Sequence, residues 1–206
     1  MKQKDEFWKV SKSTYLHKEP WLTVRKDDVI LPNGYKIPSY YVLEYPNWVN
    51  VIAITKEKEF VFIRQYRHGL KQVNYELCAG VCEATDKSPL ISAKRELLEE
   101  TGYGKGKWKK YLEISPNPGN HTNMTYCFLA TDVEKVSDQK LDSTEYLSVH
   151  LLKKEEVYSL LKKNKIMQAL MAAPLWKYMY ETNGMADKSK GISNNSKIKR
   201  SFYEKE

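Results

Sequence analysis

The sequence contains few cysteines and no long apolar run. Its three cysteines, Cys78, Cys82 and Cys127, are an odd number without the spacing of a disulfide framework, which argues against a small secreted domain. The residues after Met1 lack the basic and then apolar pattern of a signal peptide. No apolar run approaches the roughly 20 residues that a membrane-spanning helix needs. We therefore expect a soluble, cytoplasmic protein with no membrane partner.

Charge is unevenly distributed between the two signs. Lys and Arg number 34 against 26 Asp and Glu, which gives a formal net charge of +8. This balance suits anionic partners, either phosphate-rich small molecules or nucleic acid, and net charge alone does not decide between them. With 206 residues, 41% of them hydrophobic, the chain can bury one core with at most a small appended unit.

Composition divides the chain into three regions. Residues 1–45 contain short β-prone runs around a hairpin turn at Pro32, Asn33 and Gly34, which predicts a small N-terminal antiparallel β subdomain. Residues 46–182 hold the main core. Residues 183–206 are polar and rich in Lys, Ser and Asn, which predicts a basic, disordered tail.

Hydrophobic periodicity predicts the elements of the main region. The stretch 48–67 has the pattern of two antiparallel strands joined by a charged turn, and "MTYCFLATDV" and "YLSVHLL" each predict a strand. Helical spacing occurs at residues 89–101, about 154–163 and about 165–182. Pro174 lies inside the last of these and predicts a kink or break.

The predicted helix at residues 89–101 has end signals and an acidic cluster. Ser88 and Pro89 suit the N-cap and first turn, and Gly102 is a stop signal. At about 100° per residue, we expect five apolar residues on one face and three glutamates on the opposite face: Leu90, Ile91, Ala93, Leu97 and Leu98 against Glu96, Glu99 and Glu100.

These glutamates have two interpretations. Glu96 and Glu100 are four residues apart, so their carboxylates repel, and acid near a helix C-terminus also opposes the macrodipole. Both penalties disappear if a divalent cation is held between the two side chains. The alternative is a solvated helix face on which Lys94 and Arg95 are the counter-charges.

The wider context favours the first interpretation. The string "GVCEATDKSPLISAKRELLEETGY", residues 80–103, resembles the Nudix box. Its second half matches in full, through Arg95, Glu96, Leu97, Glu99, Glu100, Gly102 and Tyr103. The first half is one residue longer than the family pattern, so the loop acid is Asp86 when counted forward from Gly80, whereas Lys87 stands there when counted back from Arg95.

Resemblance to the Nudix hydrolases implies a fold, a reaction and a metal site. The implied fold is an α/β/α sandwich around a mixed sheet, and the reaction is hydrolysis of a nucleoside diphosphate linked to another moiety. The implied cofactor is Mg²⁺ or Mn²⁺. Its ligands would be Glu96, Glu99, Glu100 and the backbone carbonyl of Ala79, while Arg95 would brace the helix through an ion pair with the loop acid.

Further motifs resemble the ADP-ribose and nucleotide-sugar pyrophosphatase branch. They are "RQYR" at 64–67, "YELCAG" at 75–80, and "PNPG" at 116–119, the last being associated with ADP-ribose preference. The guanidinium of Arg67 suits a bidentate phosphate or ribose contact. The resemblance makes a larger set candidates for substrate binding: Arg64, Arg67, Glu76, Trp48, Tyr66, Pro118 and Gly119.

The same branch suggests the general base and the oligomer. The base often lies in an acidic loop before the last strand, where Glu145 has the closest position, and Glu99 is the alternative. The N-terminal sheet would pair two subunits into a homodimer, with an aromatic residue from that sheet, Trp48 or Tyr66, lining the partner's base pocket. Arg64 has the alternative of a surface strand charge.

Two other function classes are compatible with the sequence. One is a Nudix enzyme that acts on an RNA 5′ end, assisted by phosphate contacts from the basic tail, although nucleic acid is the less favoured partner. The other is a non-catalytic ADP-ribose sensor. Sensors tend to lose box glutamates and to carry a DNA-binding domain, whereas this chain keeps the glutamates and lacks such a domain.

Overall fold

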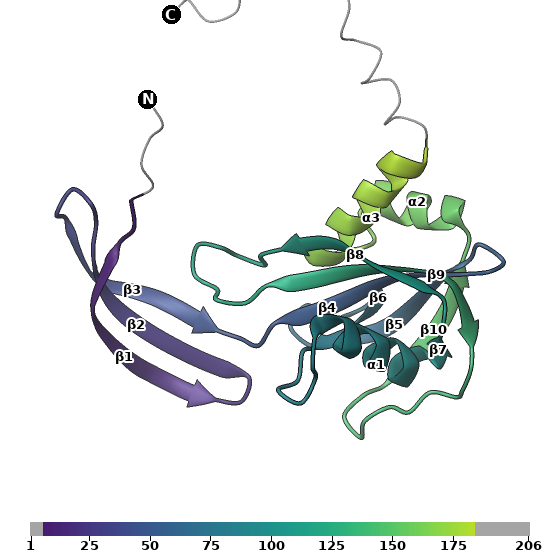
Figure 1. Cartoon of the computed structure of the whole chain (residues 1–206), viewed down its shortest axis with the longest axis horizontal. Helices are drawn as coiled ribbons and strands as arrows, with labels where there is room; N and C mark the ends of the chain where they lie inside the picture. The colour runs from purple at the N-terminus through teal and green to yellow at the C-terminus, as the bar shows by residue number, and fades with distance from the viewer. Residues whose placement is uncertain (1–5, 184–206) are drawn as a thin grey trace, which may run out of the picture.

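The computed structural model describes residues 6–183 and contains two sheets (Figure 1). One is a three-stranded sheet at the N-terminus, and the other is a seven-stranded sheet flanked by helices. The predicted tail lies outside the described residues. In the part of the chain that the structure describes, no helix is long and apolar enough to cross a membrane.

The N-terminal sheet is an antiparallel meander of β1 (Lys9–Glu19), β2 (Leu22–Ile30) and β3 (Lys36–Glu44). The predicted hairpin turn is present between β2 and β3, where the Gly34 N–H donates to the Leu31 carbonyl at 2.9 Å. Gly34 has φ of +84°, a conformation that residues other than glycine rarely adopt. The antiparallel β structure expected here is therefore confirmed.

This sheet is poorly covered. Every residue of β1 is exposed. The sheet and the segments that flank its strands expose large apolar side chains, among them Phe7, Val10, Leu16, Trp21 and Tyr35. Figure 1 shows the sheet standing apart from the rest of the fold. An exposed apolar surface of this extent on a thin sheet indicates an interaction surface.

The large sheet is mixed, as expected. Its main order is β10-β5-β6-β4-β9-β7, with β8 also paired to β9. Only the β4–β9 pair is parallel among the pairings of this sheet in the described residues. The strands are β4 (Trp48–Thr55), β5 (Phe60–Arg67), β6 (Gln72–Val81), β7 (Tyr103–Gly104), β8 (Lys107–Ile114), β9 (Thr125–Lys135) and β10 (Leu147–Leu152). The predicted antiparallel pair of β4 and β5 is present but short, because β4 pairs mainly with β6 and β9.

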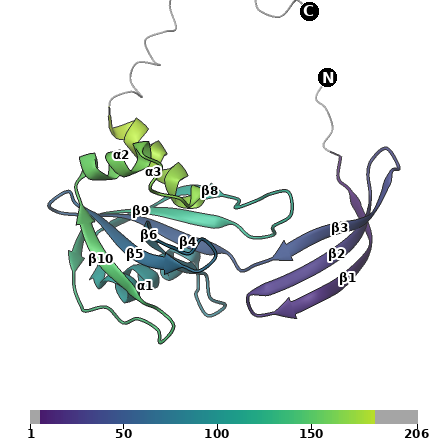
Figure 2. The ribbon, with the colours of Figure 1, turned by 180° about the vertical axis from the view of Figure 1, so that it is seen from behind.

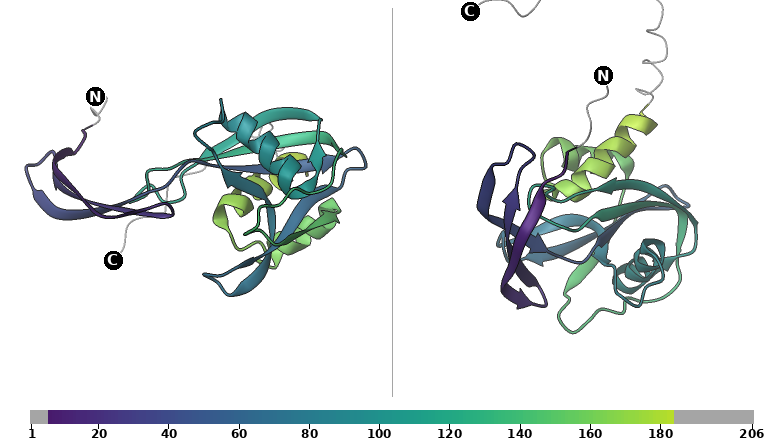
Figure 3. Two further views of the ribbon diagram at one scale, coloured as in Figure 1. Left: turned by 90° about the horizontal axis from the view of Figure 1, so that it is seen from below. Right: turned by 60° about the vertical axis from the view of Figure 1, so that its left-hand side comes forward.

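Helices cover both faces of this sheet, which confirms the α/β/α sandwich (Figures 2 and 3). On one face α1 (Pro89–Thr101) packs through Ala93 and Leu97 against Val51, Cys78 and other strand residues. On the other face α2 (Lys154–Lys162) and α3 (Ala169–Thr182) cover a second core that includes Ile52, Phe62, Val157, Leu161 and Leu175.

Of the kink or break expected at Pro174, the break does not occur, because α3 continues through this residue. Proline lacks the N–H that would bond the carbonyl four residues earlier, which belongs to Leu170. That carbonyl instead accepts a hydrogen bond from Nδ2 of Asn50 at 2.9 Å. A buried side chain from β4 therefore replaces the missing helix hydrogen bond.

Candidate active site

Helix α1 has the predicted bounds. It begins at Pro89, after Ser88 in an extended conformation, and ends at Thr101, which is followed by Gly102 with a φ of +69°. The Gly102 N–H donates to the Leu98 carbonyl at 2.8 Å, as in a left-handed C-cap. The Ser88 side chain makes no capping hydrogen bond, so Pro89 rather than the hydroxyl is the start signal that acts here.

The predicted faces of α1 were only partly right. Ala93 and Leu97 are buried against the sheet as expected. Ile91 is 45% exposed and Leu98 is 38% exposed, whereas Glu96 and Glu100 are buried. The residue packed at the centre of the face is Ala93, and at 100° per residue Glu96 and Glu100 lie within about 60° of it. The two carboxylates therefore line the edge of the face that packs on the sheet, and the solvated-face alternative does not hold for them.

Gly80 permits a close approach between β6 and Glu96. A Cβ atom at this position would lie 2.1 Å from the Glu96 carboxyl carbon and from its Oε1. One residue earlier, the Ala79 N–H donates to Oε2 of Glu100 at 3.1 Å. The backbone at Ala79 and Gly80 thus brings both carboxylates to one short stretch of strand.

Both buried carboxylates hold protons more tightly than ordinary glutamates. The pKa of Glu96 is raised to about 7 and that of Glu100 to about 8, mainly by burial and in smaller part by the charge of nearby glutamates, including Glu145, while Arg95 opposes the shift at Glu96. Stacked carboxylates with this penalty suit a divalent cation, because its charge removes the repulsion. Oxygen ligands of this kind fit Mg²⁺ or Mn²⁺.

The third predicted ligand is placed differently. The Glu99 side chain is 41% exposed and accepts a hydrogen bond from Arg95 at 3.1 Å. Among the described residues, no group of three or more His, Cys, Asp or Glu side chains is arranged to hold a metal ion. The structure therefore brings together the two inner carboxylates and the Ala79 backbone, and leaves Glu99 outside them.

Arg95 braces the start of the box as the resemblance implies. Its guanidinium bonds Asp86 at 3.1 Å, the Val81 carbonyl at 3.0 Å and Glu96 at 2.9 Å. The arginine holds the pKa of Asp86 below its usual value. Asp86, and not Lys87, is thus the loop acid, and the extra loop residue does not prevent the ion pair.

Arg67, which is partly exposed, forms an ion pair with the buried Glu76 on the adjacent strand. Nε of Arg67 lies 2.9 Å from Oε1 and its NH2 nitrogen 2.5 Å from Oε2 of Glu76, which is 3% exposed. The arginine fork is therefore bound to Glu76 in this structure. The pKa of Arg67 is raised mainly by its hydrogen bond to Glu76, is lowered by burial, and is raised to a smaller extent by the charge of Glu100. The ion pair therefore lies within electrostatic reach of the α1 carboxylates.

Other predicted substrate residues lie on the same sheet or its loops. Arg64 is exposed, with its guanidinium 5.0 Å from the centre of the Tyr75 ring. Trp48 begins β4, and Tyr66 is half exposed on β5. The expectation that Trp48 or Tyr66 comes from the N-terminal sheet was wrong, because both belong to the seven-stranded sheet.

The loop of the "PNPG" motif joins the two sheets. Pro118 and Gly119 are exposed in a turn, and the Tyr40 hydroxyl of β3 donates to the Gly119 carbonyl. The Leu43 N–H donates to the Asn120 carbonyl at 2.7 Å. This motif is therefore held against the end of the N-terminal sheet rather than against α1.

Glu145 lies in the loop between β9 and β10. Its carboxylate accepts a hydrogen bond from the Asp142 N–H at 3.0 Å, which closes a local turn. Its charge nevertheless contributes to the raised pKa of Glu96 and of Glu100, after burial as the main cause. The loop thus brings an acidic group toward the two α1 carboxylates without placing it among them.

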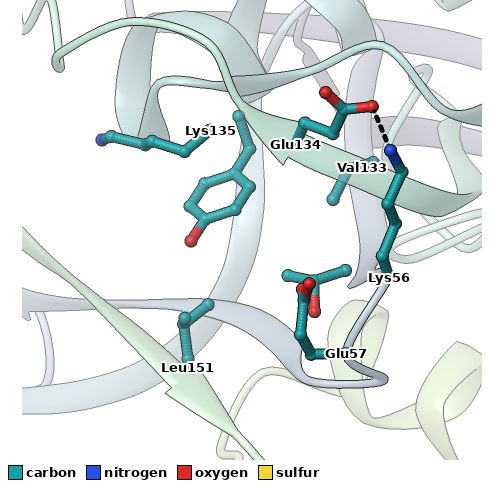
Figure 4. A pocket seen from close by; sticks show the side chains of 8 residues that line it. Lys56, Glu57, Val133, Glu134, Lys135 and Leu151 are labelled. Carbon is teal, nitrogen blue, oxygen red and sulfur yellow. Dashed lines mark ion pairs between the residues drawn. The ribbon is translucent and has the colours of Figure 1, made fainter.

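A cavity of about 210 Å³ lies elsewhere, at the far ends of β4 and β9 (Figure 4). Its lining includes Tyr103 and balanced charges, with Lys56 2.7 Å from Glu134. None of the predicted site residues lines it. Because its charges cancel, this cavity has no preference for a polyanionic substrate, and the carboxylate site is the better candidate.

Sequence reasoning missed several residues that shape the site. Gly80 entered only as the first position of a motif, and Cys78, whose thiol is buried beneath Glu100, entered only as one of the three cysteines. Gln139 and Lys140, which bond the end of α1, carry no motif at all. Spacing along the chain gives no indication of such contacts, since they join segments about forty residues apart.

Comparison with known proteins agrees with this geometry. Residues 45–173 match the family model of the NUDIX domain, and residues 8–43 match that of the nucleoside diphosphate sugar hydrolase N-terminal domain. The ADP-ribose pyrophosphatase of Bacillus subtilis (strain 168) is 31% identical over 147 residues, which cover 71% of this chain and 78% of the relative. A GDP-mannose pyrophosphatase of Enterobacter sp. (strain 638) is 31% identical over 120 residues, or 50% of this chain and 61% of the relative.

A solved structure described as an ADP compounds hydrolase has the same fold. It superposes with a TM-score of 0.75 at 20% sequence identity and covers 88% of this chain and 99% of its own. Three features of this chain agree with the matched family. They are the N-terminal segment matched to nucleoside diphosphate sugar hydrolases, the complete second half of the Nudix box, and the buried carboxylates of α1. The chain belongs to the Nudix family of hydrolases.

Proposed function

We propose that this Nudix hydrolase cleaves the pyrophosphate bond of ADP-ribose, giving AMP and ribose 5-phosphate. The observation that carries the proposal is the pair of buried carboxylates, Glu96 and Glu100, held against the β6 backbone at Ala79 and Gly80. The relative from Bacillus subtilis, named as an ADP-ribose pyrophosphatase, supports the choice of substrate. The chain matches both the N-terminal domain of nucleoside diphosphate sugar hydrolases and the NUDIX domain, which is consistent with this activity.

The cofactor we propose is Mg²⁺, with Mn²⁺ as a substitute. Glu96, Glu100 and the carbonyl of Ala79 would hold it, and Glu99 would join them after release from Arg95. When bound, the cation neutralises phosphate charge and lowers the pKa of the attacking water. The residues fit this role because two buried carboxylates with raised pKa values are stabilised by a divalent charge.

The chain's own residues would orient the diphosphate. Arg67, with its fork fixed by Glu76, presents a positively charged group on the α1 side of the sheet. Arg64, three residues away on the same strand, points to the opposite face of the sheet, where its guanidinium lies over the Tyr75 ring on the α2 and α3 side. We infer that Arg67 binds phosphate oxygens, and that Pro118, Gly119 and an aromatic side chain such as Trp48 or Tyr66 contact the rest of the substrate. Arg64 fits the alternative of a surface strand charge.

The general base we propose is Glu145. Its loop brings a carboxylate toward the α1 pair, and release from the Asp142 N–H would free it to accept a proton from water. Glu99 is the second candidate, since it is partly exposed on the same helix. Replacement of each by glutamine separates them, because only the true base should lower kcat without weakening activation by Mg²⁺.

We also infer a homodimer in which the N-terminal sheets pair. The exposed apolar side chains of β1 and its flanks support this, because a second copy would remove them from water. Free thiols at Cys78, Cys82 and Cys127 are consistent with a reducing, cytoplasmic setting.

The substrate proposal is tested by kcat/KM on ADP-ribose, GDP-mannose, UDP-glucose and capped RNA at fixed Mg²⁺. We expect ADP-ribose to be preferred. GDP-mannose is the second candidate, because a relative carries that name. A preference of about tenfold, or about 1.4 kcal/mol, for a hexose-linked nucleotide would overturn the ADP-ribose assignment and leave the Nudix chemistry standing.

A further inference from the structure

The C-terminal end of α1 is bonded by one segment of the chain, residues 135–140, which we name the helix clamp. The last four carbonyls of an α-helix have no partner within the helix. Here the Leu98 carbonyl is satisfied by the cap at Gly102, but the next three are satisfied by the clamp. The Lys140 N–H donates to Glu99 at 2.8 Å, the Gln139 amide to Glu100 at 2.6 Å, and Lys135 Nζ to Thr101 at 2.8 Å.

The clamp also fits closely against the helix cap. The Val136 and Ser137 N–H groups both donate to the Gly102 carbonyl, at 2.9 and 3.2 Å. A Cβ atom at Gly102 would lie 2.1 Å from the Ser137 carbonyl oxygen. Glycine is therefore needed there for its positive φ and for the space that the clamp occupies.

The loop that carries Glu145 begins where the clamp ends. Lys140 is fixed to the Glu99 carbonyl, and Leu147 is paired with Gln65 in β5. Only residues 141–146 lie between these two attachments. A segment of six residues spans at most about 20 Å, so both attachments strongly restrict where the Glu145 carboxylate can go.

We propose that Gln139 is a positioning residue for catalysis: by bonding the Glu100 carbonyl, it ties the loop that carries Glu145 to the helix that carries Glu96 and Glu100. This inference rests on the proposed role of Glu145 as general base. The bond is made to the backbone of Glu100, one of the two buried carboxylate residues. Movement of the helix end would therefore move the loop with it.

The test is a double-mutant cycle on the full chain with ADP-ribose and Mg²⁺. Gln139→Met removes the amide donor at nearly constant length, and we expect kcat to fall by about tenfold, with KM and the activation constant for Mg²⁺ changed less than about twofold. Gln139→Lys keeps a donor for the helix carbonyl and should restore most of kcat. Lys140→Ala is the matched control, because it removes an exposed side chain but keeps the backbone N–H bonded to Glu99, so kcat should stay at the wild-type value.

The decisive comparison uses Glu145→Gln as the background. If Gln139 acts through Glu145, Gln139→Met should have almost no further effect on the residual kcat of Glu145→Gln. An undiminished tenfold loss in that background, or wild-type kcat in the single variant, would overturn the proposal. Wild-type kcat for Glu145→Gln would instead refute the general-base assignment, and the role of Gln139 with it. Melting temperatures of all variants identify any loss that is due to unfolding.

Discussion

Among single residues, Gly80 has a role that any side chain at this position would destroy. A Cβ atom there would displace the Glu96 carboxyl group, which is the end of a flexible side chain. For Gly80→Ala we expect a folded protein whose melting temperature changes by only a few degrees, but whose turnover falls at least about 100-fold. Gly69→Ala is the control, since a Cβ atom at Gly69 meets no atom within 4 Å. Near-normal turnover in Gly80→Ala would contradict the placement of Glu96.

The protonation of Glu96 and Glu100 predicts how stability changes with pH. Burial raises their pKa values to about 7 and about 8, above the ordinary 4.5. Between pH 4.5 and about pH 8 the folded state therefore binds more protons than the unfolded state. Their stabilising contribution is complete below pH 4.5 and is lost as pH rises through 7 and 8. In a chelator, the melting temperature should therefore be higher at about pH 5.5 than at about pH 8.5, on the order of 5 °C.

Two controls accompany this pH prediction. In Glu100→Gln the decrease between the two pH values should be smaller, because one titrating group has been removed. Saturating Mg²⁺ should reduce the decrease in the wild type by favouring the charged carboxylates. A wild-type melting temperature that rises over this interval in the chelator would contradict the burial of these groups.

At the scale of elements, α3 depends on a side chain from β4. The carbonyl of Leu170, which Pro174 leaves without a helix partner, is bonded by Asn50. Asn50→Leu should lower the free energy of unfolding by about 1–3 kcal/mol, the cost of an unsatisfied carbonyl. In a Pro174→Ala background the restored N–H should bond Leu170, so the same substitution should cost less. Equal costs in both backgrounds, measured by urea denaturation, would contradict this account.

Helix α1 illustrates how far sequence reasoning reached. Its bounds were predictable because Pro89 and Gly102 act through local backbone geometry. Its buried face was predicted only in part, because the expected apolar face extended to Ile91 and Leu98, which are exposed, and left out Glu96 and Glu100, which are buried. The burial of Glu96 depends on the absence of a side chain at Gly80, on a different element.

Contacts distant in sequence were beyond prediction for the same reason. Asn50 and Leu170 are 120 positions apart, and no local pattern indicates that an amide will replace the hydrogen bond lost at Pro174. The ion pair of Arg95 was predictable in part. The motif implied that Arg95 pairs with an acid of the loop, but only the path of the loop shows that Asp86, and not the position of Lys87, supplies that acid. The mixed sheet and its two helical layers followed from the family resemblance.

At the scale of the whole molecule, the N-terminal sheet should hold two copies together. Leu16 is 53% exposed on β1, and its replacement by lysine would put charge into an apolar contact. We expect the wild type to sediment as a dimer at micromolar concentration and Leu16→Lys to shift toward monomer. Leu70→Lys, a control at a residue 57% exposed on the seven-stranded sheet's β5–β6 turn, should remain dimeric. A monomeric wild type would contradict the dimer.

We expect Glu96 and Glu100 to form the centre of metal-dependent pyrophosphate hydrolysis. The most direct test is the Mg²⁺-dependent release of AMP from ADP-ribose by the wild type and by Glu96→Gln combined with Glu100→Gln. We expect turnover by the wild type and a loss of at least about 1,000-fold in the double variant. The melting temperature of the double variant without Mg²⁺ should stay equal or rise, because the buried repulsion is gone. A folded double variant that retains turnover within about tenfold of the wild type at saturating Mg²⁺ would contradict this expectation.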